Sequence, residues 1–263
     1  MSAKYTKEEV IALKKQCFKS LNSMLESFLS KPVPIGTNSS DYLKKCALIS
    51  KWLMQYTNYI SFETKFTPQK LIRYKRGDII FVNFGFNIGA EFGGEHYAVV
   101  LDNENDRNSA TITVIPLSSY KPGKKIHPND IYLGNELFEK MHLKLKTQLA
   151  QLKEQSEKNA ILLNSLRSNT STEDNDKINN LIVELQNAQK QLDLEILKAA
   201  KIKSELFTLK QGSIAKVQQI TTVSKLRIYN PKNTSDPLYG IRLSTNTMKL
   251  INSKIKQFFV FDE

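Results

Sequence analysis

Long apolar runs are missing from this chain. No stretch of about 18 consecutive apolar residues occurs, so the sequence predicts no membrane-spanning helix. The first ten residues are polar and lack the apolar centre of a secretory signal. These two absences favour a cytoplasmic protein.

Cysteine and histidine are also scarce. The two cysteines, Cys17 and Cys46, both fall on apolar faces of predicted helices. A disulfide between them is conceivable, but two buried thiols fit a reducing compartment better. The three histidines do not share metal-ligand spacing with cysteines. The sequence therefore predicts neither a metal site nor a cofactor.

Acidic residues are outnumbered by basic ones, which leaves a net charge of +12 at neutral pH. The excess is concentrated at the ends of the chain, because residues 1–75 carry a net +8 and residues 211–263 a net +5. A field of this kind attracts polyanions such as nucleic acids and speeds their encounter. It also serves solubility or attraction to an acidic protein, and charge alone does not choose among these.

Residues 1–73 are predicted to be an N-terminal helical region, in which residues 1–60 form a hairpin of two helices. Thr6 and Glu9 match a capping box, and apolar residues then recur every three or four positions. Residues 31–36 contain two prolines and a glycine, which end the first helix, and a second helix begins at Asp41.

Strand-forming residues are frequent from Arg76 to about residue 134 and again from Ser213. Runs rich in β-branched and aromatic residues are interrupted by turn residues, and the last run is followed by an amphipathic helix over 243–258. The predicted strands cover 78–84, 97–101, 110–117, 130–133, 213–217 and 220–228.

Residues 135–210 separate the strands into two groups. Apolar residues at heptad spacing, in two arms of about 30 residues, predict an antiparallel coiled coil protruding by about 45–50 Å. Four short strands alone would leave open edges, so the strands on both sides should form one domain. The predicted fold is an α+β protein with a small β-barrel interrupted by this hairpin.

Two segments carry the most informative pattern. Arg76–Gly85 is RGDIIFVNFG, and Gly89–Leu101 is GAEFGGEHYAVVL. They resemble the MazF/PemK family of toxin ribonucleases, which share an RGD-type first strand, a G-x-E-x-G-G loop, a basic residue and an A/V-V-V-L strand. The resemblance continues at Thr113–Ser119 and resumes after the hairpin at Val217–Arg227.

The resemblance implies an SH3-like barrel formed by residues 74–134 and 211–263. It implies a homodimeric endoribonuclease that cuts single-stranded mRNA without a metal, as the toxin of a type II toxin–antitoxin system with an antitoxin protein as partner. In that reaction the ribose 2′-hydroxyl attacks the adjacent phosphate and leaves 2′,3′-cyclic phosphate and 5′-hydroxyl ends. The reaction needs a proton acceptor, a proton donor and groups that stabilise the extra charge on the phosphate.

The resemblance implies that His96 and Ser118 are the catalytic residues. The family's active arginine follows the double glycine, where His96 stands in this chain, and histidine can act as base or acid near neutral pH. The alternative is that His96 merely hydrogen-bonds at a strand start. Ser118 matches the family's threonine at the end of the third strand, although Ser-Ser-Tyr-Lys-Pro-Gly is also ordinary turn sequence. Thr221 replaces a frequent family arginine, which removes one phosphate donor.

Five further residues are predicted to bind the substrate. Glu91 matches the family's loop glutamate and either contacts a base edge or orders the loop. Gly93 and Gly94 either let the backbone approach the substrate or permit positive φ. Ser119 adds a second hydroxyl donor, and Lys121 can hold a backbone phosphate.

Two other functions remain open from the sequence. Because His replaces Arg, the barrel could be catalytically inactive and bind nucleic acid or protein. Alternatively, the coiled coil could be the main element of a scaffold protein.

Overall fold

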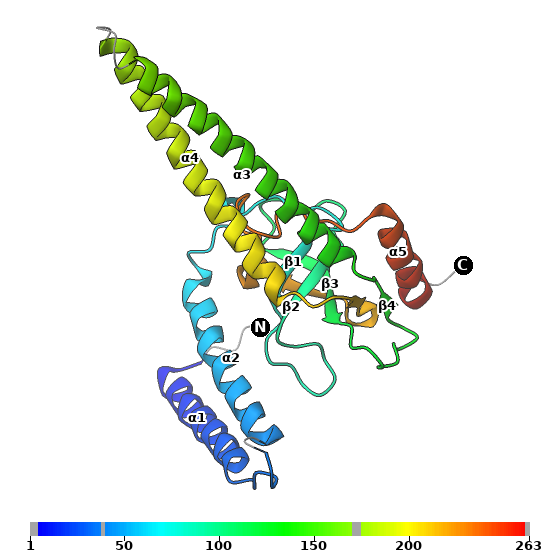
Figure 1. The fold of residues 1–263 in the computed structure, drawn as a ribbon. Helices are drawn as coiled ribbons and strands as arrows, with labels where there is room; N and C mark the ends of the chain where they lie inside the picture. Colours follow the sequence, from blue (N-terminus) through cyan, green and yellow to red (C-terminus); the bar gives the residue numbers. More distant parts are fainter. Residues whose placement is uncertain (1–4, 38–39, 170–174, 261–263) are drawn as a thin grey trace. The chain divides into compact units, whose positions relative to one another are not determined.

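The computed structural model describes residues 5–37, 40–169 and 175–260. The chain divides into two compact units, residues 1–65 and 66–263, and each is described by itself. The smaller unit contains helices α1 (Lys7–Leu29) and α2 (Asp41–Glu63), which contact each other (Figure 1).

The start of α1 is fixed by the predicted capping box. The Thr6 backbone N–H donates to the Glu9 carboxylate at 2.8 Å, and the Thr6 hydroxyl accepts the Glu9 amide at 3.2 Å. Both cysteines are free, with Cys46 buried and Cys17 exposed. The expectation of two buried thiols is therefore wrong for Cys17. A hairpin of two helices has no third layer of its own to cover the outer side of α1, which buries none of its residues.

The larger unit is built on one antiparallel sheet of short strands. They are β1 (Ile79–Asn83), β2 (Glu95–Val100), β3 (Thr111–Ser119), β4 (Ile131–Tyr132), β5 (Ser213–Ala215), β6 (Thr221–Ser224) and β7 (Ile228–Asn230). The order is β4-β5-β3-β2-β1-β7, and β6 pairs with β3. Strands from both sides of the long helical insertion thus lie in one sheet.

The sheet is open, which corrects the expectation of a barrel. Among the described residues, no strand ladder joins the end strands β4 and β7. These strands have only two and three residues, too few for a long closing ladder. Strand β3 pairs along its first part with β6, Thr111 opposite Ser224, and at its end with β5, Ser119 opposite Ser213.

The strand predicted over 220–228 is divided by a 3-10 turn, η3 (Lys225–Arg227). Lys225 is only 2 % exposed, and its ammonium donates to the Asp106 carbonyl at 2.9 Å. The Ser224 hydroxyl accepts the Leu226 amide and caps the turn. Burying an ammonium requires a hydrogen-bond acceptor, so the chain leaves the strand geometry here. Two other 3-10 turns are η1 (Pro68–Lys70) and η2 (Val217–Gln219).

Helices α3 (Glu136–Asn169) and α4 (Asn175–Thr208) have 34 residues each and lie side by side (Figure 1). The turn predicted at 168–172 lies partly outside the described residues. Helix α5 (Thr245–Phe259) follows the last strand.

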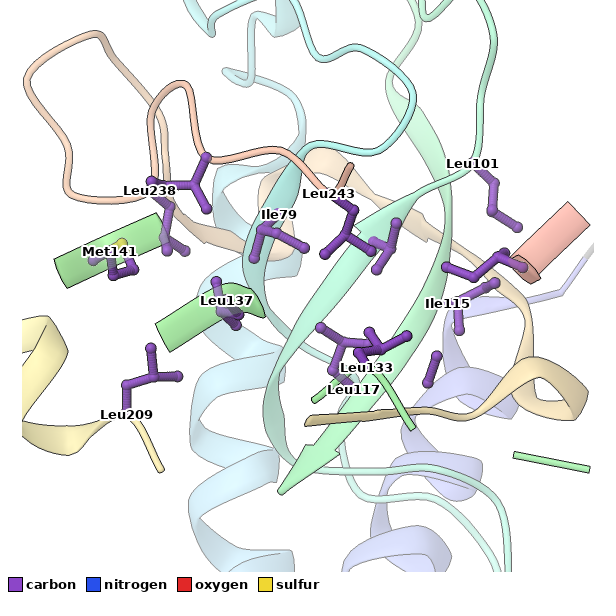
Figure 2. Close-up of a cluster of buried hydrophobic side chains, with 14 of the residues drawn as sticks. Ile79, Leu101, Ile115, Leu117, Leu133, Leu137, Met141, Leu209, Leu238 and Leu243 are labelled. Atoms are coloured by element: carbon purple, nitrogen blue, oxygen red, sulfur yellow. The ribbon is translucent and has the colours of Figure 1, made fainter. Parts of the chain in front are cut away.

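The two faces of the sheet bury different clusters. On one face Ile79, Ile115 and Leu117 pack with Leu137 and Met141 of α3 (Figure 2). Ile202 of α4, 2 % exposed, belongs to the same cluster, so the base of the helical pair is part of the core. The opposite face buries a second cluster that includes Ile80, Val82, Ala98, Val100, Ile112 and Val114. Alternation along β2 places His96 on the side of this second cluster.

Candidate active site

A cleft of about 810 Å³ lies at the C-terminal end of β3. Its walls come from β2, β3 and β5, from the loop between β3 and β4, and from the segment after α4. Its polar and aromatic lining consists of His96, Ser118, Ser119, Tyr120, Lys121, Lys124, Lys125, His127, Asp130, Lys210 and Lys216.

His96 and Ser118 enter this cleft from neighbouring strands. The β2–β3 ladder ends at the pair Ala98–Pro116, and His96 and Ser118 each lie two residues beyond that pair on their own strands. Alternation along both strands places the two side chains on the same side of the sheet. Ser118 in turn pairs with Ile214 of β5.

The His96 ring is half-buried and held by its surroundings. It packs against the Phe92 ring, with the ring centroids 4.6 Å apart. Burial lowers the pKa of His96 below its ordinary value of 6.5, against opposing hydrogen bonds to the backbone of Leu117 and Gly93 and the charge of Glu95. The imidazole is therefore mainly neutral at neutral pH and competent to accept a proton.

A backbone hydrogen bond joins the two ends of the loop before β2. The Gly94 amide donates to the Gly85 carbonyl at 2.7 Å, and Gly94 has φ +86°. A Cβ on Gly93 would lie 2.8 Å from the Gly85 oxygen, so only glycine fits there. Gln219 of η2 fixes the loop from outside, since its side chain accepts the Phe92 amide at 3.2 Å.

The structure separates the predicted binding residues into two groups. Ser119 and Lys121 line the same cleft as His96. Glu91, Gly93 and Gly94 lie in the loop before β2 and outside the cleft lining. The Glu91 carboxylate accepts the Ile88 amide at 3.2 Å, which is the loop-ordering role.

Several cleft residues escaped the sequence reasoning. Lys210 and Lys216 come from the far side of the helical insertion, about 90 residues after Lys121. Lys216 pairs with Asp130 at 2.6 Å and ties the β3–β4 loop to the end of β5. No local sequence signal links these positions, because only the return of β5 beside β3 brings them together.

The structure also places His127 in this cleft. The Asn129 amide donates to His127 Nδ1 at 3.2 Å. A neutral ring accepting at Nδ1 carries its proton on Nε2, so His127 offers an N–H donor to a ligand. Within the described residues, no group of three or more His, Cys, Asp or Glu side chains is arranged to hold a metal ion.

Residues 75–185 match a family model described as PemK-like, MazF-like toxin of type II toxin–antitoxin system. This stretch of the chain is similar to the PemK-like family. Members of that family are generally endoribonucleases and serve as toxins of type II toxin–antitoxin systems. No curated protein matches the chain significantly.

The PemK-like match covers β1 to β4, α3 and the first part of α4. It therefore contains His96 and Ser118 but ends before β5, whose residues complete the cleft. No helix in the described part of the chain is long and apolar enough to cross a membrane.

Proposed function

We propose that this PemK-like chain is an endoribonuclease that cleaves single-stranded RNA in the cleft holding His96 and Ser118. One observation carries the proposal: the two side chains that match the family's active residues extend from adjacent strands into one basic cleft. The ribose 2′-oxygen gives its proton to His96 and bonds to phosphorus as the bond to the 5′-oxygen breaks, and the leaving 5′-oxygen takes a proton from water. The products are a 2′,3′-cyclic phosphate and a 5′-hydroxyl, and the family resemblance supports a metal-independent route.

His96 is the proton-transfer residue of the proposed reaction. Its pKa, lowered by burial, leaves a neutral ring that can take the 2′-hydroxyl proton near neutral pH. The Phe92 ring on one side restricts its orientation. A positioned base of this kind contributes about 10²–10⁴-fold to a rate.

Hydroxyl and imidazole donors stabilise the charge on the phosphate. Ser118 lines the cleft together with His96, and Ser119 follows it at the exposed end of β3. The Nε2–H of His127 adds a third donor from the β3–β4 loop. Donors already positioned by a folded backbone lower the barrier because they need not reorganise during the reaction.

The cleft's charge suits an RNA backbone. Lys121, Lys124 and Lys125 come from the β3–β4 loop, and Lys210 comes from the segment after α4. Among the described residues, Asp130 is the only acidic one that lines the cleft, and it is paired with Lys216. Closely spaced cations of this kind bind phosphates and release counterions.

As a toxin, the protein would have mRNA as its target and an acidic antitoxin as its partner. The basic cleft supports both, because an acidic segment bound there excludes RNA. We also propose that the active form is a cytoplasmic homodimer, as the resemblance implies. Sedimentation of the purified chain with and without the neighbouring gene's product tests the assembly.

The deciding experiment incubates the purified protein with a labelled single-stranded RNA in the presence of a chelator. End-group analysis should find 2′,3′-cyclic phosphate and 5′-hydroxyl fragments. His96→Ala and Ser118→Ala should each reduce the cleavage rate by about 100-fold or more. Circular dichroism should show that both variants remain folded.

His142→Ala provides the matched control, because His142 is an exposed histidine on α3 outside the cleft. It should cleave at the wild-type rate. RNA that is bound but not cut would make the domain a binding module instead. Cleavage that survives His96→Ala at full rate would remove His96 from the mechanism.

A further inference from the structure

Two tyrosines lie near the proposed catalytic pair, Tyr120 in the cleft lining and Tyr132 just outside it. Tyr120 follows Ser118 by two residues and lines the cleft. Tyr132 of β4 pairs with Ile214, the residue of β5 that also pairs with Ser118. Because neighbouring strands lie about 4.8 Å apart, Tyr132 is about 10 Å from Ser118 along the row across the sheet.

The two rings form one aromatic surface. Their centroids are 4.9 Å apart with an interplanar angle of 50°. Tyr132 is 45 % exposed, whereas Tyr120 is half-buried beside it. The contact is between the two rings and does not depend on either hydroxyl group. A function of this pair must therefore depend on the aromatic rings.

Gly212 fixes the position of Tyr120. The Tyr120 amide donates to the Gly212 carbonyl at 2.9 Å. A Cβ on Gly212 would lie 2.8 Å from the Tyr120 Cβ, and Gly212 has φ +81°. The backbone therefore leaves room for this tyrosine at the edge of the cleft and limits its movement.

We propose that Tyr120 and Tyr132 form a base-stacking subsite that holds an unpaired base next to the scissile phosphate. The inference rests on the proposed nuclease function and adds the reason for a single-stranded substrate. Aromatic rings beside basic groups, here Lys121, Lys124 and Lys125, are the combination that binds single-stranded nucleic acid. A base already stacked within a duplex presents no free face to such rings.

Binding of a strand that cannot react tests the subsite independently of cleavage. The probe is a fluorescent single-stranded oligonucleotide in which every sugar is 2′-deoxy, with one abasic position moved along the strand. For the wild type, one abasic position should weaken binding by about tenfold. Tyr120→Ala should weaken binding of the intact strand by a similar factor and should lose its sensitivity to that position.

Three variants separate stacking from packing. Tyr120→Phe should behave as wild type, because it keeps the ring, whereas Tyr120→Leu keeps apolar bulk and should behave as Tyr120→Ala. Tyr132→Ala should weaken binding at the same abasic position. Tyr239→Ala is the control, since Tyr239 is a comparably exposed tyrosine, at 41 %, outside the cleft.

The inference fails if Tyr120→Ala and Tyr120→Leu show the wild-type pattern of abasic sensitivity, or if the wild type has no sensitive position. Its failure is distinct from failure of the nuclease proposal. The first is measured by binding of an unreactive strand, and the second by fragment formation from RNA.

Discussion

Asp130 and Lys216 form an ion pair at 2.6 Å that joins the loop after β3 to the end of β5. Their side chains are 11 % and 29 % exposed, so this pair is better shielded from water than those on the long helices. The loop that it holds carries His127 and three lysines of the cleft. The ion pair therefore links the stability of the sheet edge to the geometry of the site.

Replacing Asp130 should test that link. Asp130→Asn leaves the Lys216 ammonium with a neutral partner, and the free energy of unfolding should fall by about 1–3 kcal/mol. Urea unfolding measures the loss, and RNA affinity should fall with it. Glu154→Gln is the control: Glu154 and Lys158 form an exposed pair at 2.7 Å on α3, and its removal should change nothing measurable. If Asp130→Asn and Glu154→Gln lowered the free energy of unfolding equally, shielding from water would not explain the contribution of the Asp130–Lys216 pair.

The pH dependence of stability should include a contribution from His96. Its folded pKa lies below the unfolded value of 6.5, so between those two values the unfolded state binds more protons. Stability is therefore fully present above 6.5, falls as the pH drops toward the folded pKa, and levels off below it. Urea unfolding across this range measures the slope.

His96→Gln should flatten that slope, and the cleavage rate of the wild type should fall over the same acidic range. His96→Arg restores the basic residue of the family and should remove the acidic inflection, because arginine stays charged throughout. An unchanged pH profile in His96→Arg would show that another group causes the inflection.

The loop before β2 should depend on Gln219. Its side chain accepts the Phe92 amide at 3.2 Å and donates to the Ala90 carbonyl at 3.4 Å. Gln219→Ala should speed amide hydrogen exchange in residues 88–94 and lower cleavage by about 10- to 100-fold, because Phe92 no longer holds the His96 ring. Gln218→Ala is the matched control, since Gln218 is exposed and adjacent. A protected loop in Gln219→Ala would contradict this account.

Removal of the outer turns of α3 and α4 should leave the protein folded, whereas removal of the turns that pack against the sheet should not. Gln148 hydrogen-bonds to Glu195 across the two helices, so Ala150 and Asp193 can be joined by a short glycine-rich turn. That protein should remain folded and keep its cleft. Deletion of 140–208 removes Met141 and Ile202, each worth about 2–5 kcal/mol in a core, and should not fold.

Thermal unfolding of the two shortened chains compares them directly. If both unfold like the full chain, the base of the helical pair is not part of the core. If the protein with the shorter deletion also fails to fold, the outer turns of the two helices contribute more to stability than their exposed side chains indicate.

Binding of RNA should depend on salt through the lysines of the cleft. Lys124→Ala and Lys125→Ala should each reduce the slope of log affinity against log salt by about 0.7, the value for one single-strand phosphate contact. Titrations at several salt concentrations measure it. Lys153→Ala is the control, because its side chain is 82 % exposed on α3. An equal change of slope for Lys153→Ala would assign the effect to net charge.

Some features of this protein follow from local sequence alone. The capping box at Thr6 and the strand around Ile79–Asn83 depend on residues a few positions apart, and their periodicity was enough to predict them. The likeness to the PemK-like family likewise rests on short segments. It identified His96 and Ser118 as matches to the family's active residues, and their catalytic role stays a prediction.

Other features required the tertiary structure. Lys210 and Lys216 reach the cleft of Lys121 only because β5 returns beside β3 after the helical insertion. The open edge of the sheet and the exposure of Cys17 also depend on which elements cover which, and not on the order of residues. Periodicity reports which face of an element is apolar, whereas contacts between distant segments are decided by the free energy of packing the whole chain.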